Sequence, residues 1–295
     1  MSSSPPPDAS AAAAPAAAAS NDGTSNNTLD DMSHNEKVLK TQDQMNAITQ
    51  EIQESQALTS ELLPLESLQP QYADTNAFFL QGISYLASKY QSLRTTRGDG
   101  NCFYRAVWYQ LCDLLLTNKT EAQRLFHFLK NESMQLTTTK GGYEEVALEI
   151  FYDALVEFLQ EIVDGKMTKE NMHKQLTEDG GVSEYCTWYL RALTATWVKA
   201  NADLYVHYLD EEYFGDVQRF CAAQIEPVGS EATNIPITAL AECLGVAISI
   251  EYLDGHAFDP SKGLVNHVMG EGGGDKLKLT LLYRPGHYDI LYPKA

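Results

Sequence analysis

The chain has 295 residues and carries 21 Lys and Arg against 40 Asp and Glu, a formal net charge of −19. A surface of this sign repels nucleic acid and anionic membranes and favours a basic or mixed-charge protein partner, although it serves equally well to keep a protein in solution. Five widely spaced cysteines without a CxxC pair, and no apolar run near the ~18 residues of a membrane span, argue against a disulfide framework, a zinc site and a transmembrane helix, and favour a reduced protein of the cytoplasm and nucleus.

The first 70 residues divide by composition. Residues 1–35 are rich in Ser, Pro, Ala and Asn and contain one leucine and no aromatic residue, so we expect a disordered leader. In residues 36–70 a thin apolar stripe recurs at helical spacing among Gln, Asp and Glu, at Met45, Ile48 and Ile52. Two explanations stay open for this stripe: an arm that folds against a partner, and a frayed helix that packs on its own domain.

The main domain, residues 71–295, begins with helices and ends with strands. Apolar residues at helical spacing predict helices at residues 76–93, 103–116, 120–131, 143–163, 183–201, 216–225 and 237–244. Alternating β-branched and apolar residues then predict strands at residues 246–253, 277–283 and 287–292. The Pro-Gly turn before the last strand makes the final two strands an antiparallel pair. The fold class is therefore α+β, with a helical majority and a small, mostly antiparallel sheet near the C-terminus.

A candidate nucleophile lies where a glycine-containing loop enters a predicted helix. Gly98 and Gly100 bracket Asp99 and permit a tight, irregular loop, and Cys102 follows directly before the apolar-periodic segment. The free N–H groups and the positive dipole end at a helix start favour a thiolate. A buried, inert cysteine is the usual alternative, but it does not need a polar, backbone-demanding loop, so we favour a reactive Cys102.

A base for this nucleophile is predicted near the C-terminus. His287 and Asp289 are two residues apart on a predicted strand, so their side chains share one face. The carboxylate can then orient the imidazole and stabilise its protonated form. A single histidine is more often a surface or satisfied core residue, and that is our interpretation of the other six. For His287, the same-face Asp289, the glycine turn before it and the loop cysteine together favour catalysis.

Two blocks of the sequence resemble a known enzyme family. Residues 98–106, GDGNCFYRA, and residues 283–292, YRPGHYDILY, resemble the two signature blocks of the ovarian tumour (OTU) family of deubiquitinating cysteine proteases, in its otubain branch. The resemblance extends over about residues 40–293. It implies a papain-like OTU fold and an enzyme that needs no metal or cofactor.

The resemblance also implies a role for each motif residue. Cys102 matches the nucleophile of the family, His287 its general base, and Asp289 the residue that orients the histidine, for which we expect an amide to be a partial substitute. Asp99 matches a loop aspartate counted with the active site, which would shape the loop so that backbone N–H groups form an oxyanion hole. Three further residues belong to this candidate oxyanion loop: Gly98, Gly100 and Asn101.

The activity implied by the resemblance is hydrolysis of the isopeptide bond between the C-terminal glycine of ubiquitin and a lysine. The family branch prefers polyubiquitin joined through the lysine at position forty-eight of ubiquitin, and residues 36–70 match its ubiquitin-binding arm, with Met45, Ile48 and Ile52 as contact residues. The implied partners are ubiquitin, polyubiquitin and ubiquitin-conjugating enzymes, and we expect a monomer. One alternative is a non-catalytic inhibitor that sequesters ubiquitin-charged conjugating enzymes. Another, a papain-like protease with unrelated substrates, lacks the cysteine block of that family.

Overall fold

The structure, a computed structural model, describes residues 40, 44, 47, 48, 50–259, 261–270 and 276–294. Contacts divide the chain into two units, Met1–Glu51 and Ile52–Ala295. The described residues of the first unit are all helical, and Ile48 among them is 49% exposed. The predicted leader, residues 1–35, and Met45 lie outside the described residues.

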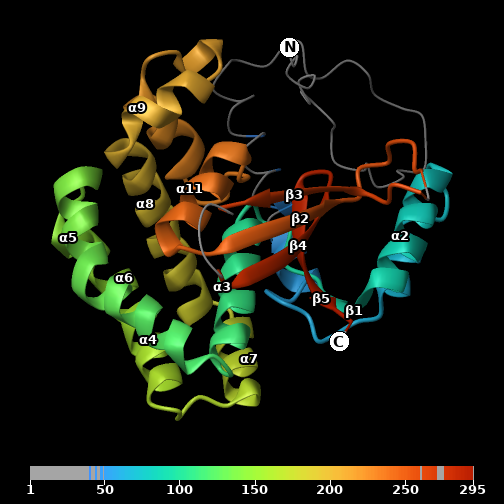
Figure 1. Cartoon of the computed structure of the whole chain (residues 1–295), viewed down its shortest axis with the longest axis horizontal. Coiled ribbons are helices and arrows are strands. Elements are labelled where there is room, and N and C mark those ends of the chain that lie inside the picture. The colour runs from blue at the N-terminus through green and yellow to red at the C-terminus, as the bar shows by residue number, and fades with distance from the viewer. Residues whose placement is uncertain are drawn as a thin grey trace. The chain divides into compact units, whose positions relative to one another are not determined.

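A mixed sheet of five strands lies between two groups of helices in the second unit (Figure 1). Its strands, in spatial order, are β1 Tyr90–Arg94, β5 His287–Pro293, β4 Lys278–Arg284, β2 Ala247–Tyr252 and β3 Val265–Met269. Strands β2 and β4 run parallel, whereas the other neighbouring pairs are antiparallel. The expected small, mostly antiparallel sheet beneath a helical majority is confirmed.

Helices cover both faces of this sheet. The α-helices are α2 Ala77–Lys89, α3 Cys102–Leu115, α4 Lys119–Phe128, α5 Met134–Leu136, α6 Glu145–Val163, α7 Lys169–Thr177, α8 Val182–Ala200, α9 Ala202–Tyr205, α10 Val217–Phe220 and α11 Asn234–Leu244. Short 3₁₀ and π segments join them: η1 Leu65–Tyr72, η2 Leu129–Ser133, η3 Thr137–Gly141, η4 Val206–Tyr208, η5 Glu211–Tyr213 and η6 Cys221–Ile225. Helix α3 contacts β4 and β5 on one face, together with the group around α6 and α8, whereas α2 and η1 pack on the other face (Figure 1).

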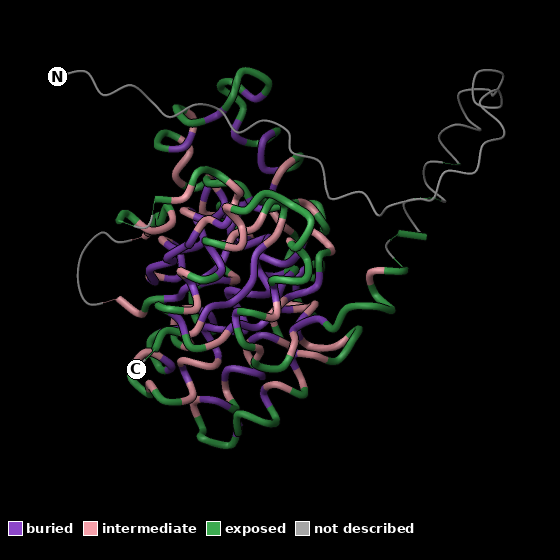
Figure 2. Tube along the Cα trace, turned by 90° about the vertical axis from the view of Figure 1, so that its right-hand side faces the viewer, coloured by how far each residue is buried: buried purple, intermediate pink, exposed green. Residues whose placement is uncertain are grey.

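Alternating side chains of the sheet explain this two-sided packing. Leu281 of β4 and Ile290 of β5 join the core around α3, whereas their neighbours Leu282 and Leu291 join the core under α2. Successive side chains of a strand point to opposite faces, so a continuous apolar run is buried only when both faces are covered. Figure 2 shows the buried residues gathered in the interior, with exposed residues along the outer helices and loops.

The elements depart from the prediction at helix α7, which was not predicted, and at two strands. The predicted helix 76–93 ends at Lys89, and the next residues form β1, in which Leu93 pairs with Leu291 of β5. In a segment as short as Tyr90–Arg94, the spacing of apolar residues is compatible with either a helix or a buried strand. The segment is a strand because it pairs with the edge of β5. Strand β3 is largely exposed and has no buried face to detect in the sequence. No helix among the described residues is long and apolar enough to span a membrane.

Candidate active site

Helix α3 and strand β5 bring together residues that lie far apart in the chain. Cys102 is the first residue of α3, as expected at the boundary between loop and helix, and His287 is the first residue of β5. The buried side chain of Gln110 ties α3 to the sheet. Its Nε2 donates to the carbonyl oxygen of Leu291 (2.8 Å), and its Oε1 accepts from the N–H of Thr280 (2.7 Å). The helix is thereby held along β5 with its first turn beside the first residues of the strand.

His287 lies between Cys102 and Asp289. Its Nε2 is 2.9 Å from Asp289 Oδ1, and Cys102 lies near enough to the ring to raise the pKa of His287. Because Asp289 occupies Nε2, Nδ1 is the nitrogen left for the sulfur. A Cβ built on Gly98 would lie 3.7 Å from this Nδ1, so the loop before Cys102 passes the same side of the ring. The three residues expected to form a catalytic set therefore lie together around the imidazole.

The carboxylate of Asp289 is fully buried, accepts three hydrogen bonds and forms an ion pair with Arg284. Its Oδ1 accepts from His287 Nε2 and from the N–H of Thr96 (3.0 Å), and its Oδ2 accepts from Arg284 Nε (2.8 Å). Arg284 Nη2 lies 2.7 Å from the same Oδ2 and completes the ion pair. Burial raises the pKa of Asp289, but the charges of His287 and Arg284 more than offset this effect and leave the pKa below its ordinary value. Asp289 is therefore an anion held in fixed orientation.

This anion sets the charge of the histidine. Burial lowers the pKa of His287, but Asp289 and then Cys102 outweigh it and raise the pKa from 6.5 to about 10. At neutral pH the ring is then an imidazolium, and a neighbouring imidazolium favours the thiolate form of a cysteine. The arrangement can supply a nucleophilic sulfur and a proton for a leaving group from the same pair of side chains.

Asp99 shapes the loop from within. Its Oδ1 accepts from the N–H of Asn101 (3.0 Å) and from Arg105 Nη1 (2.9 Å), and its Oδ2 accepts from Arg105 Nη2 (2.6 Å). Arg105 is almost fully buried and lies one helical turn beyond the start of α3. Asp99 thus closes the loop onto the helix, which supports the loop-shaping role expected for it.

Arg191 of α8 fixes the other side of the loop. Its guanidinium donates to Asn101 Oδ1 (3.1 and 2.9 Å) and to the carbonyl oxygen of Gly100 (2.8 Å). It also donates to the carbonyl oxygens of Ile225 and Ser230, so it joins the loop to the segment before α11. A buried guanidinium with several main-chain acceptors rigidifies what it contacts.

The loop closes tightly against its neighbour at Gly100. Gly100 has φ +75°, and a Cβ built there would lie 1.7 Å from the carbonyl oxygen of Gly229. The N–H of Gly229 donates to Asn101 Oδ1 (3.0 Å). Only glycine fits at residue 100, because both the backbone angle and the space exclude a side chain.

The N–H groups of the loop fall into two classes. The N–H of Gly98 donates to Gln56 Oε1 (3.0 Å) and that of Asn101 donates to Asp99 Oδ1. Within the described part of the chain, the N–H groups of Asp99, Gly100 and Cys102 have no protein acceptor. These three donors at the start of a helix are the ones available for a developing oxyanion.

Four charged residues around the site were not identified from the sequence. Arg284 and Arg105 lie inside the two motif blocks, and their position was the only signal. Arg191 is recognised only through tertiary contacts. Glu231, before α11, is a further carboxylate near the ring: burial raises the pKa of Glu231 and the charge of His287 lowers it.

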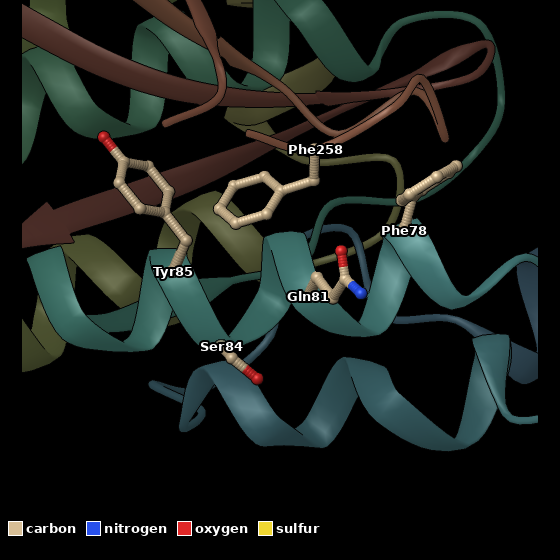
Figure 3. A pocket seen from close by; sticks show the side chains of 5 residues that line it. All are labelled: Phe78, Gln81, Ser84, Tyr85 and Phe258. Carbon is tan, nitrogen blue, oxygen red and sulfur yellow. The ribbon is translucent and has the colours of Figure 1, made fainter. Parts of the chain in front are cut away.

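Two other features of the second unit lie apart from these residues. A groove of about 800 Å³ lies between α2 and the loop after β2, and it is lined by Phe78, Gln81, Ser84, Tyr85 and Phe258 (Figure 3). None of these five is a candidate site residue. Among the described residues, no group of three or more His, Cys, Asp or Glu is arranged to hold a metal ion.

The predicted ubiquitin-contact residues are only partly described. Met45 lies outside the described residues, Ile48 belongs to the first unit, and Ile52 is the half-buried first residue of the second unit. Their role stays a prediction.

Comparison with known proteins identifies a matching family model, similar sequences and similar solved structures. The family model Peptidase C65 Otubain matches residues 34–293. An Arabidopsis thaliana protein, ovarian tumor domain-containing deubiquitinating enzyme 1, is 34% identical over 244 residues, 78% of this chain and 79% of its own. Human ubiquitin thioesterase OTUB1 is 33% identical over 273 residues, 92% of this chain and 94% of its own. A solved complex, h/ceOTUB1–ubiquitin aldehyde–UBCH5B~Ub, matches with a TM-score of 0.78 and 30% identity over 89% of this chain and 99% of that chain.

Proposed function

The chain belongs to the otubain family, peptidase C65, a family of cysteine proteases, and from this premise we propose that it hydrolyses isopeptide bonds of polyubiquitin with Cys102 as nucleophile. His287 is the general acid and base, and Asp289 orients it. The observation that carries the proposal is the grouping of Cys102, His287 and Asp289, in which one imidazole nitrogen bonds the carboxylate and the other is left for the sulfur.

The first half of the reaction forms a thioester. The sulfur of Cys102 attacks the carbonyl carbon at the C-terminal glycine of ubiquitin, and the carbonyl oxygen becomes an oxyanion bound by the N–H groups of Asp99, Gly100 and Cys102. His287 Nδ1 gives its proton to the lysine amine as the carbon–nitrogen bond breaks. Asp289 keeps the ring in the tautomer that this transfer needs.

The second half releases ubiquitin. The neutral His287 accepts a proton from water, and the resulting hydroxide attacks the thioester carbonyl through a second oxyanion in the same site. Collapse of this intermediate expels the Cys102 thiolate and yields the C-terminal carboxylic acid of ubiquitin, which loses its proton to the solvent. The ring is again an imidazolium beside a thiolate, so no group outside the chain is consumed except water.

Linkage preference is the finer part of the proposal. A preference for chains joined through the lysine at position forty-eight of ubiquitin is supported by the likeness of residues 36–70 to the otubain arm. The same likeness supports ubiquitin-conjugating enzymes as partners, since similar solved complexes contain ubiquitin aldehyde with UBCH5B~Ub or UBC13~Ub. Those complexes also favour a second candidate function, non-catalytic inhibition of ubiquitin-charged conjugating enzymes.

Di-ubiquitins of every linkage separate these functions. We expect the full chain to cleave the dimer joined through position forty-eight fastest, and Cys102→Ala to cleave none while still inhibiting a charged conjugating enzyme. Equal cleavage of all linkages would refute the preference. Normal cleavage by Cys102→Ala would refute the catalytic assignment, and loss of inhibition in that variant would remove the second function.

A further inference from the structure

The segment ahead of the sheet lies along the strand that leads into the candidate oxyanion loop. Leu63 and Leu93 exchange backbone hydrogen bonds (2.8 and 2.9 Å), and the N–H of Ser60 donates to the carbonyl oxygen of Thr95 (2.8 Å). This antiparallel pairing continues beyond β1, where the N–H of Arg97 donates to the carbonyl oxygen of Leu58 (3.0 Å). Both segments belong to the second unit.

Gln56, which precedes the paired residues in the chain, contacts the loop itself. Its carbonyl oxygen accepts from Arg97 Nε (2.8 Å), and its side-chain Oε1 accepts from the N–H of Gly98 (3.0 Å). A Cβ built on Gly98 would lie 3.7 Å from Gln56 Oε1 and also 3.7 Å from His287 Nδ1. The Gln56 amide and the imidazole therefore flank the same glycine.

The hydrogen bond from Gly98 fixes one particular peptide group. The peptide between residues 97 and 98 is held at both ends: its carbonyl oxygen accepts from Arg105 Nη1 (3.1 Å), and its N–H donates to Gln56. The next peptide carries the N–H of Asp99, one of the three donors without a protein acceptor. Gly98 and Gly100 give the loop wide backbone freedom, so a fixed peptide at residue 98 limits the direction in which the Asp99 N–H points.

We propose that Gln56 is a positioning residue for the oxyanion loop: its amide oxygen occupies the Gly98 N–H and so directs the neighbouring N–H of Asp99 toward the reacting carbonyl oxygen. This inference rests on the proposed cysteine-protease function. From the sequence, Gln56 was only part of the predicted arm. The proposal gives this residue, which directly follows the helix at 51–55, a role in holding the oxyanion loop. Gln56 does not touch substrate; it acts through Gly98 and Asp99.

The test uses the full chain and ubiquitin that carries a rhodamine amide at its C-terminus, a substrate without a second ubiquitin. Gln56→Ala should lower kcat by about tenfold and change KM by less than about twofold, since one of several oxyanion donors is misdirected rather than removed. Gln56→Glu keeps an acceptor for the Gly98 N–H and should retain kcat within about threefold. The matched control is Gln53→Ala, one turn earlier, whose exposed side chain makes none of these contacts.

Two inhibitors distinguish loop positioning from general damage. Ubiquitin aldehyde forms a tetrahedral adduct with the cysteine and needs the oxyanion donors, whereas iodoacetamide alkylates the sulfur without them. Gln56→Ala should bind ubiquitin aldehyde about tenfold more weakly and react with iodoacetamide at Cys102 within about twofold of the wild-type rate.

The kinetic and inhibitor measurements on Gln56→Ala decide between loop positioning and general damage. Wild-type kcat in Gln56→Ala, or an equal loss of both inhibitor reactions, would overturn the positioning role. A wild-type protein that fails to cleave the substrate would instead overturn the proposed function.

Discussion

Replacing Asp289 by asparagine tests how the buried carboxylate supports the site. The side chain is completely buried, and two donors converge on each of its oxygens. Asparagine has one oxygen and an NH₂ group, so one pair of donors must face an NH₂. The sequence alone suggested that an amide would replace part of the function. The contacts in the structure lead us to predict a larger loss, because His287 and Arg284 both pair with the negative charge.

The size of the effect follows from these contacts. Removing one partner of a buried ion pair costs about 3–5 kcal/mol, because the other charge stays buried without compensation. With Asp289 neutral, the largest cause that raises the pKa of His287 is lost and only Cys102 still opposes the effect of burial, so the ring holds the proton for the leaving amine less firmly. We expect turnover to fall by about 10²–10⁴-fold.

Urea unfolding and turnover of a C-terminal ubiquitin amide measure both effects in the same variant. The matched control is Asp74→Asn, an exposed aspartate between η1 and α2, which should match wild type in both assays. Adding Arg284→Gln to Asp289→Asn should recover part of the stability but not the turnover, because the unpaired guanidinium is gone while the imidazolium still lacks its anion. The prediction is refuted if Asp289→Asn has an unfolding free energy within about 1 kcal/mol of wild type and also keeps about a third of the wild-type turnover.

Three further predictions concern the loop and the pH dependence. Gly100→Ala should destabilise the protein by at least about 1–3 kcal/mol, since φ is +75° and the new Cβ meets Gly229, and an unchanged melting curve would show that the loop is not held closed. Arg191→Met should lower the unfolding free energy by about 3–5 kcal/mol and lower kcat more than KM, because the loop around Asn101 loses its buried guanidinium donor. Wild-type kinetics in this variant would show that Arg191 does not hold the loop for catalysis. For His287 the folded pKa of about 10 lies above its ordinary 6.5, so its stabilisation is complete below pH 6.5 and is lost as pH rises toward 10. The difference in unfolding free energy between wild type and His287→Ala should shrink over that interval, and a constant difference would contradict the raised pKa.

Much of the fold could be predicted because its elements are long and periodic. The segment 143–163 is α6 within two residues, and the alternating apolar residues of 277–283 and 287–292 form β4 and β5. The error at β1 arises because pairing with another segment decides between helix and strand. Tyr90–Arg94 is a strand because β5 offers an edge, and nothing within those five residues states this.

In the candidate site, the reacting residues could be predicted from the sequence, whereas the residues that support them could not. Cys102, His287 and Asp289 were found because their chemistry shows in short blocks: a loop entering a helix, and a same-face pair on a strand. The residues that hold them in place carry no such local signal. Arg191 lies 90 residues from Asn101, and Gln56 lies 42 from Gly98, so only the folded chain reveals these contacts.

Labelling with a ubiquitin probe that carries a thiol-reactive C-terminus tests the central claim most directly. The chain has five cysteines, all free and all buried, so chance reactivity does not favour one of them. We expect one adduct per molecule, mapped by mass spectrometry to Cys102, absent in Cys102→Ala and strongly slowed in His287→Ala. An adduct on any of the other four cysteines, or an unmodified Cys102 after prolonged incubation, would contradict a ubiquitin-directed nucleophile at the start of α3.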